Sequence, residues 1–430
     1  MLTRTCKVRL IVDKEDEEKL LELGDVFAKC WNEVNYLRRQ QFFNEVGVDF
    51  ATTEKMIYEK YKDILKVNAQ QVARKNAEAW RSFFKSLKLK KEGELPPFII
   101  PKPPGYRKDR KKGKRRPFLV IRCDRYEIKD DYIYLRDFKL KLKYRGRIHL
   151  RGKPGRLEIY YDVVRRRWYA CIPFRAEEKI VRDEWRKMPS TPLGNKGAGI
   201  DLGINNLLAV FVDDGTTFLV NGRPLKAEAF YWKREIAEAQ SKEDMDRVRK
   251  YYVIWRSRWE HYVRSNLRDL FERLHELGVS RVKVGYPKYA AREPNKSRNV
   301  NFEITNLWSY RKIHQWIKDL CEEYGMKYIQ IDEQYTSKIC PLCGKTHNNS
   351  RKHRGLFVCP VKRKAMNADL AAAFNILYKG ESSQEDSPNG CKTAPLSVLP
   401  ALAGTLASSG RGGGQICFQH MYFPHNPFFK

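Results

Sequence analysis

The feature that most constrains the fold begins at Gly197, where GAGIDLGINNLLAVFVDDGTTFLVNG predicts three consecutive strands. Turns are expected at 205–206 and 213–215, because Asn, Asp and Gly favour turn conformations. A helical section follows over about 227–278, then a strand in RVKVGYP and a helix over about 305–324. A strand in MKYIQID and a helix in NADLAAAFNILYKG close the region. This order of elements predicts an α/β domain.

The first half of the chain predicts a different domain. A strand is expected over Thr3–Val12, and helices over about Asp16–Glu45 and Glu54–Leu87. Strand-like runs then recur from Phe118 to Phe174, among them RLEIYYDVV and RRWYACIPF. These runs predict a small antiparallel barrel or sandwich that is joined by the first strand, with the helices inserted. The whole chain is therefore expected to be an α+β multidomain protein.

The charge balance gives the first indication of a partner. Lys and Arg number 84 against 52 Asp and Glu, which gives a formal net charge of +32. Such a charge opposes compaction unless a polyanion neutralises it, and nucleic acid is the polyanion that Lys and Arg bind most readily. A basic ribosome-associated or thermophilic surface is the alternative. We expect no membrane partner, because no long apolar run and no basic amphipathic helix with a broad apolar face is found.

Several basic residues are candidates for nucleic-acid binding. The segment PPFIIPKPPGYRKDRKKGKRRPF is too rich in proline for a helix and too charged for a core, so it predicts a surface loop that contacts nucleic-acid backbones. An ordinary solvated face is the alternative. The candidates from this loop and the preceding helix are Arg74, Arg81, Arg107, Lys108, Arg110, Lys111, Lys112, Lys114, Arg115 and Arg116.

Asp201 lies inside the otherwise apolar run GIDLGINN. An acid in a strand indicates an exposed face, a turn or a metal site. The order of elements after Gly197 resembles the ribonuclease H-like nuclease fold, in which a carboxylate on the first, central strand meets others that together hold two divalent metals. Asp369, in the first turn of the last helix, is the matching acid, although it could also only complement the helix dipole. Oxygen ligands suit Mg²⁺ or Mn²⁺.

Three stretches carry a closer resemblance: GIDLGINN, the insert that begins YTSKICPLCG, and NADLAAAFNIL. They resemble the RuvC-type nuclease of the TnpB family, transposon-encoded relatives of type V CRISPR effectors, strongly over 197–379 and more loosely before. The resemblance implies RNA-guided cleavage of double-stranded DNA beside a short flanking motif, with a guide RNA from the transposon end. The implied domains are a wedge-like β-barrel (1–14 and 98–180), a helical recognition lobe (15–97), a linker (181–196), a RuvC-like nuclease domain (197–332 and 363–380), a zinc-ribbon-like insert (333–362) and a flexible tail (381–430).

The family's site residues transfer with one exception. Its first Asp matches Asp201, the Asp of its closing helix matches Asp369, and the final Asn of that pattern matches Asn375. The family's fourth strand ends in Glu, but here Gly285 stands in that place. Either the site is broken, or Glu333 at the end of the next strand supplies the third carboxylate. Its neighbour Asp332 is an alternative source, and the less favoured alternatives are Glu293 and Glu303.

The insert predicts a structural zinc site. Cys340 and Cys343 form one zinc-knuckle half, and Cys359 supplies a third thiolate. The family pattern has four cysteines, but Lys362 stands where the fourth is expected, so His347 or His353 would complete the site. A vestigial loop that is held by packing is the alternative. The chain begins without a signal-peptide pattern, so we expect a reducing, cytoplasmic compartment in which the other cysteines are buried thiols. The protein is expected to act at the nucleoid of a prokaryotic cell.

Three functions follow from these observations. The first is an Mg²⁺-dependent RNA-guided DNA endonuclease with structural Zn²⁺, expected to act as a monomer with its guide RNA. The second is a guided DNA-binding protein that has lost catalysis and acts by occupancy. Intact Asp201 and Asp369 argue against this second function, and the lost Glu at Gly285 argues for it. The third is a strand-joining transposase, for which no tyrosine nucleophile motif with paired histidines is found.

Overall fold

A computed structural model describes residues 2–95, 99–108, 113–286, 309–333, 339–347, 350–353 and 355–379. The chain divides into two compact units, residues 1–188 and 189–430, which are described separately below. The predicted flexible tail, the centre of the basic loop (109–112), Glu293 and Glu303 lie outside the described residues.

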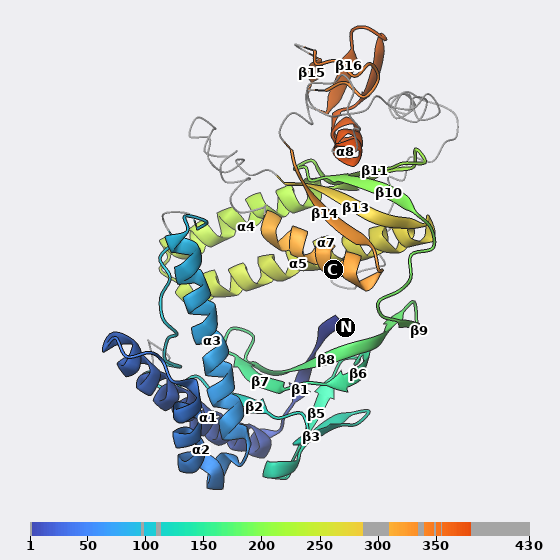
Figure 1. The fold of residues 1–430 in the computed structure, drawn as a ribbon. Helices are drawn as coiled ribbons and strands as arrows, with labels where there is room; N and C mark the ends of the chain where they lie inside the picture. Colours follow the sequence, from blue (N-terminus) through green and yellow to red (C-terminus); the bar gives the residue numbers. More distant parts are fainter. Residues whose placement is uncertain are drawn as a thin grey trace. The chain divides into compact units, whose positions relative to one another are not determined.

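The first unit is built on a mixed-length antiparallel sheet of nine strands (Figure 1). Its main path runs β2-β7-β8-β1-β5-β4-β3, and β6 and β9 pair with β8. The strands are β1 (Leu2–Ile11), β2 (Phe118–Ile121), β3 (Tyr126–Ile128), β4 (Tyr132–Leu135), β5 (Leu140–Arg145), β6 (Leu150–Pro154), β7 (Leu157–Asp162), β8 (Arg167–Val181) and β9 (Glu184–Lys187).

The prediction of a closed barrel is wrong. Within the described residues, β2 and β3 end the main path of the sheet without pairing with each other. All four residues of β2 are buried, and Phe118 packs edge-on against Phe27 and Trp31 of the first helix. The helices thus cover this end of the sheet and bury apolar surface that closure would otherwise have buried.

Three helices are inserted between β1 and β2: α1 (Lys14–Phe43), α2 (Phe50–Leu65) and α3 (Asn68–Lys91). The single helix predicted over 54–87 is broken at Lys66, which adopts a φ of 52°. The three helices pack around Arg38, whose guanidinium donates to Thr53 Oγ1 (3.0 Å), Ala73 O (2.7 Å) and Asn76 Oδ1 (3.0 Å). These bonds satisfy a fully buried cation with neutral oxygens.

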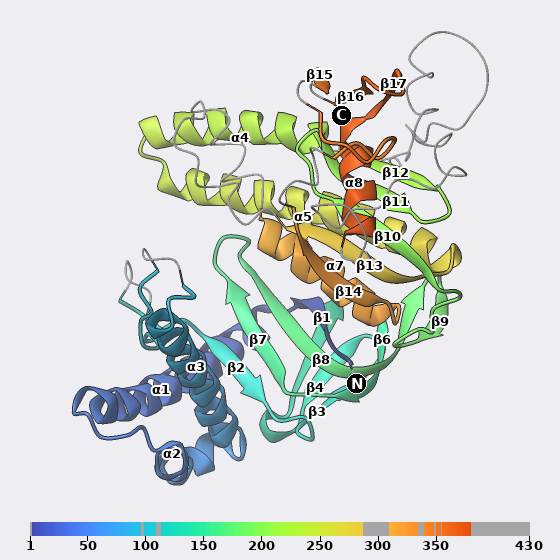
Figure 2. The same cartoon turned by 45° about the horizontal axis from the view of Figure 1, so that its top comes forward.

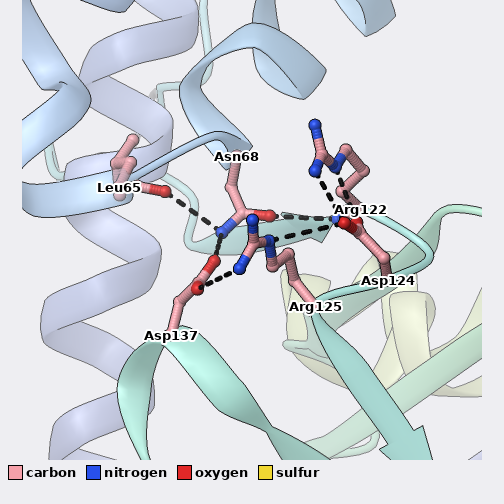
Figure 3. A network of polar contacts seen from close by, with 6 residues as sticks. All are labelled: Leu65, Asn68, Arg122, Asp124, Arg125 and Asp137. Carbon is pink, nitrogen blue, oxygen red and sulfur yellow. Dashed lines mark hydrogen bonds and ion pairs between the residues drawn. The ribbon is translucent and has the colours of Figure 1, made fainter.

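Asn68 ties the junction of α2 and α3 to the sheet (Figure 3). Its amide donates to Leu65 O (3.1 Å) and to Asp137 Oδ2 (2.8 Å), and its Oδ1 accepts from the backbone N–H of Arg122 (3.0 Å). Every polar atom of this buried side chain therefore joins the helices to residues next to β2 or β4.

The second unit contains a five-stranded sheet in the order β12-β11-β10-β13-β14. Strands β10, β13 and β14 are parallel, and β11 is antiparallel to both of its neighbours. The order of elements predicted from Gly197 is present. These elements are β10 (Lys196–Asp201), β11 (Asn206–Val212), β12 (Thr217–Asn221), α4 (Arg223–Ser241), α5 (Met245–Glu276), β13 (Val279–Tyr286), α7 (Tyr310–Glu323), β14 (Lys327–Asp332) and α8 (Ala368–Tyr378).

Helices cover both faces of this sheet (Figures 1 and 2). Ala198 and Ile200 of β10 share a buried cluster with residues of α5 and α7. Residues Gly197 and Gly199 alternate to the opposite face, where a Cβ atom at Gly199 would overlap the carbonyl of Ala373 and the side chain of Leu377. Glycine at this position therefore lets α8 lie directly on the central strand.

A small sheet, β15-β16-β17, precedes α8. Its strands are β15 (Arg351–His353), β16 (Leu356–Cys359) and β17 (Lys364–Asn367). Phe357 and Met366 of this insert are buried in one cluster with Ala368 and Ala371 of α8. The insert therefore packs on the first turn of the helix that carries Asp369.

Candidate active site and metal centre

Asp201 is the last residue of β10 and belongs to the face of the sheet that α8 covers. Strand side chains alternate, so Asp201 follows Gly197 and Gly199 on this face. The register pairs Ile200 with Val284 of β13, which places Asp201 and Gly285 at the ends of adjacent parallel strands. The polar residue in this apolar strand thus marks the edge where strand ends converge.

Asp369 reaches the same edge from α8. Asn367 caps the helix, because its side-chain oxygen accepts from the backbone N–H groups of Asp369 (2.9 Å) and Leu370 (3.2 Å). Asn206, the first residue of β11, donates from its amide to Asp369 Oδ2 at 2.8 Å. This hydrogen bond holds one carboxylate oxygen of Asp369 and thereby sets the orientation of the whole carboxylate group.

Glu333 follows β14 directly, and its side chain occupies the space beside Gly285. A Cβ atom built on Gly285 would lie 2.6 Å from Glu333 Oε1 and 2.8 Å from Glu333 Cγ. The neighbouring acid Asp332 is exposed and pairs in register with Tyr286. The side chain of Glu333, whose Oε1 is buried, thus occupies the space that a side chain at Gly285 would need.

Asp201 is affected by the other two acids. Burial, and then the charges of Glu333 and Asp369, raise the pKa of Asp201 well above its usual value, while Arg351 of β15 acts in the opposite direction. Burial, and then the charge of Asp332, raise the pKa of Glu333 to about 7. Carboxylates that repel one another in a partly buried site are the donor set that a divalent cation stabilises.

These shifts predict that a divalent cation stabilises the protein more at high pH. The folded-state pKa values of Asp201 and Glu333 lie above their unfolded values, so their contribution favours folding below about pH 4 and is lost as the pH rises through the folded-state values, which for Glu333 is about 7. At pH 8, ionised Glu333 should cost about 3 kcal/mol of unfolding free energy, which a bound cation offsets. We expect Mg²⁺ to raise the thermal midpoint more at pH 8 than at pH 6, and Glu333→Gln to remove most of this difference. An equal effect of Mg²⁺ at both pH values, unchanged by the substitution, would contradict the assignment.

Sequence reasoning missed three residues at this edge. Asn206, which orients Asp369, belongs to GIDLGINN, where a polar residue at a strand start was the available signal. Burial, and then the charges of Glu333 and Asp201, raise the pKa of the Tyr310 phenol at the start of α7. Arg351 comes from the cysteine insert, and its charge acts on Asp201. The two residues are too far apart in the sequence for this interaction to be predicted.

The cysteine insert brings four ligand atoms together. Within the described residues, one ligand atom each from Cys340, Cys343, His347 and Cys359 lies within 4.8 Å of all the others. His347 Nε2 lies 2.9 Å from Cys343 Sγ and 3.8 Å from Cys359 Sγ. Three thiols and one imidazole form a set that can bind zinc.

The insert's two other candidate ligands lie elsewhere. His353 is exposed on β15 and outside the four-residue cluster. Lys362, in the place of a fourth cysteine, contributes its backbone instead, because its N–H donates to Cys359 Sγ at 3.3 Å. Burial opposes ionisation of the Cys359 thiol, yet this N–H and the neighbouring thiols hold its pKa below the usual value.

Asn375 connects this cluster with α8. Its side chain is buried and donates to the carbonyl of Ile339, the residue before Cys340, at 2.8 Å. The backbone N–H of Ala368 donates to Gly355 O at 3.0 Å. Asn375, which matches the family's final Asn, therefore joins the helix that carries Asp369 to the segment that carries Cys340.

The basic candidates differ in their exposure and in their partners. The guanidinium of Arg107 lies over the rings of Phe118 (3.3 Å) and Trp31 (5.0 Å), and burial lowers its pKa to about 10, so it holds the loop on α1. Arg74 pairs with Glu54 (2.9 Å) and Arg115 with Asp25 (2.7 Å), both at the surface. Arg110, Lys111 and Lys112 lie outside the described residues. The candidates that are exposed are Arg74, Arg81, Lys108, Lys114, Arg115 and Arg116.

Comparisons with known proteins agree with this arrangement. A family model described as "Probable transposase" (OrfB_IS605) matches residues 173–291, and one described as "Cas12f1-like, TNB domain" matches 310–376. A solved Cas12f1 complex with its single guide RNA and target DNA is similar in fold, with a TM-score of 0.51 and 11% identity over 87% of this chain and 98% of that one. The fold is thus of the Cas12f1-like class.

The family follows from sequence relatives. TnpB-like protein ORF457 of Acidianus two-tailed virus is 41% identical over 402 residues, which cover 87% of this chain and 86% of the viral protein. The CRISPR-associated endodeoxyribonuclease Cas12f1 of Sulfoacidibacillus thermotolerans is 37% identical over 79 residues, 18% of this chain and 19% of that protein. The chain belongs to the TnpB family. Among the helices that the structure describes, none has the length and apolar character to cross a membrane.

Proposed function

We propose that this protein is an RNA-guided endonuclease that cuts double-stranded DNA next to a short flanking motif and is associated with a transposon. The observation that carries the proposal is the convergence of three carboxylates, Asp201, Glu333 and Asp369, at one edge of the sheet. The endodeoxyribonuclease activity named for a partial relative and the RNA and DNA in the related complex support it.

The donor set fits hard divalent cations. Among the described residues, the three acids offer carboxylate oxygens, which Mg²⁺ and Mn²⁺ prefer over sulfur or nitrogen ligands. Burial first, and then neighbouring carboxylates, raise the pKa values of Asp201 and Glu333, and a bound divalent cation would favour their ionised forms. When bound, two such ions would activate an attacking water and stabilise the leaving oxygen of a phosphodiester.

The chain's own residues would orient these ligands. Asn206 holds Asp369 through its amide, and β10 fixes Asp201 between two paired strands. Arg351 brings positive charge toward Asp201 and could contact the scissile phosphate. Structural zinc at Cys340, Cys343, His347 and Cys359 would support the helix that carries Asp369.

Sequence choice would be delegated to a guide RNA. The net charge of +32 suits a chain that binds RNA and heteroduplex backbones, while base pairing reads the target. The partners we propose are a guide RNA from the transposon end and double-stranded target DNA, bound by a monomer of the protein. The exposed basic candidates, with Arg110, Lys111 and Lys112 of the loop, would contact these backbones.

Occupancy without cleavage is the second candidate function. Gly285 in place of the family's glutamate favours it. The position of the Glu333 side chain beside Gly285 favours an active enzyme instead, because the carboxylate is supplied from the next strand.

A programmable cleavage assay tests the proposal. The protein is co-expressed with RNA from its flanking transposon end, and the purified complex receives plasmids with a guide-matched target beside a randomised flank, in Mg²⁺ or in EDTA. We expect Mg²⁺-dependent cuts that Asp201→Ala lowers by about 10³-fold or more, because it removes a ligand shared by the metal site. Tight guide-dependent binding without cuts would instead establish occupancy.

A further inference from the structure

His314 of α7 contacts β13 near its end, at Gly285 and Tyr286, and β14 near its start, at Tyr328. Its Nε2 is 3.0 Å from the carbonyl oxygen of Gly285, and its Nδ1 is 2.7 Å from the hydroxyl of Tyr328. The ring of Tyr286 packs edge-on against the imidazole, with centroids 5.0 Å apart. The side chain is 6% exposed, so these contacts define its environment.

The hydrogen-bond chemistry fixes the state of this imidazole. A carbonyl oxygen only accepts, so Nε2 carries the proton and donates to Gly285, and Nδ1 accepts from the Tyr328 hydroxyl. Burial lowers the pKa of His314, which keeps the ring neutral. One neutral imidazole therefore joins β13, through Gly285, to β14, through Tyr328.

These two strands are the ones that place Glu333. Glu333 follows β14 directly, and its carboxylate and Cγ lie in the space that the missing side chain of Gly285 leaves open on β13. The pairing of β10 with β13 ends at Val284, so Gly285 lies beyond that ladder and is paired only on its other side, with Ile331 of β14. A hydrogen bond to its carbonyl thus holds the strand end on which the acid rests.

We propose that His314 is a positioning residue for Glu333: through Gly285 near the end of β13 and Tyr328 near the start of β14, it holds the two strands in the register that brings this carboxylate to Asp201. The inference depends on the proposed metal site. His314 lies on the α7 side of the sheet and touches neither the ligands nor the substrate in this account. Its effect is expected on the affinity for the divalent cation, because supporting partners of metal ligands typically contribute about 10- to 100-fold.

The test is Mn²⁺ binding to the guide-RNA complex, measured by electron paramagnetic resonance as the difference from the Asp201→Ala complex, which has the same RNA background. His314→Phe preserves a ring but removes both hydrogen bonds, and we expect the Mn²⁺ dissociation constant to rise about 10-fold. His314→Gln keeps a donor for Gly285 O and is expected to stay within about threefold of the wild type. Tyr328→Phe, which removes only the second partner, should lie between them.

A second buried histidine of the same unit provides the control. His275 of α5 is 7% exposed and bonds to Thr191 O at 3.0 Å, away from the strand ends that carry the acids. His275→Phe should leave Mn²⁺ affinity unchanged, even if the thermal midpoint falls as it does in His314→Phe.

The possible outcomes distinguish a failure of the positioning role from a failure of the proposed metal site. Wild-type Mn²⁺ affinity in His314→Phe, or an equal loss in His275→Phe, would overturn the positioning role. If His314→Phe does not fold, equal Mn²⁺ affinities of Tyr328→Phe, His314→Gln and the wild type would overturn it. If wild-type and Asp201→Ala complexes bind the same amount of Mn²⁺, the metal site itself is refuted.

Discussion

Glu333→Gln is expected to lower the rate of Mg²⁺-dependent cleavage by about 10³-fold or more while guide-RNA binding is unchanged. The substitution keeps the volume of the side chain that fills the space beside Gly285, where Glu333 Oε1 lies 2.6 Å from the position of an added Cβ. It removes only the negative charge and one strong oxygen ligand. The measurement is the single-turnover cleavage rate with the guide complex, and RNA binding is followed separately.

A double variant that moves the carboxylate from the end of β14 back to β13 tests this prediction further. Gly285→Glu alone would collide with Glu333 and with Ile376 Cδ1, which lies 2.7 Å from the added Cβ. In the Glu333→Ala background the first obstacle is gone, and the second is the movable end of a side chain. Gly285→Glu with Glu333→Ala should therefore recover about 10-fold or more of the activity lost in Glu333→Ala, since one ligand charge is restored.

Wild-type cleavage by Glu333→Gln would eliminate Glu333 as a ligand. Asp332→Asn is the matched control and should cut nearly normally, because Asp332 is exposed.

Cys359→Ser is expected to release bound zinc and to reduce cleavage strongly. Cys359 lies in the four-residue cluster and is fully buried, and structural zinc contributes about 10 kcal/mol or more to small domains that depend on it. The insert packs on Ala368 and Ala371, and Asn375 bonds to Ile339 beside Cys340. Loss of the metal should therefore loosen the start of α8 and displace Asp369.

Zinc content per chain after exhaustive dialysis, together with the cleavage rate, checks this expectation. We expect one zinc per chain in the wild type and none in Cys359→Ser or His347→Ala. His353→Ala is the matched control, because this exposed histidine lies in the insert but outside the cluster, and it should retain the metal. A wild-type protein without zinc, or full cleavage by a zinc-free Cys359→Ser, would contradict the supporting role of the insert.

The sequence predicted the second unit better than the first. Its element order follows from local patterns: β10 and β11 are short apolar runs with a turn between them, and Asn367 is a strong helix cap. Whether the first sheet closes into a barrel depends on tertiary packing. The apolar run Phe118–Ile121 predicts a strand buried on both faces but does not predict whether helices or another strand cover it. The break at Lys66 was equally hidden, since lysine gives no local signal for a positive φ.

The candidate site shows the same division. Asp201 is conspicuous because it interrupts an apolar strand, and Asp369 because it opens a helix. Glu333 could be inferred only from the topology, since β14 had to lie beside β13 before its end could reach Gly285. Asn206 and His314 make hydrogen bonds with residues distant in sequence; a polar residue at a strand start is the one local signal for Asn206, and His314 has none.

The most direct test of the account is a structure of the guide-RNA complex with target DNA and Mn²⁺, with cleavage blocked by a non-hydrolysable phosphate linkage. Anomalous scattering would locate the metal. We expect Mn²⁺ with oxygen atoms of Asp201, Glu333 and Asp369 as ligands, at about 2.1 Å. Metal held without Glu333, or no metal between these carboxylates, would contradict the claim that the glutamate lost at Gly285 is supplied from the end of β14.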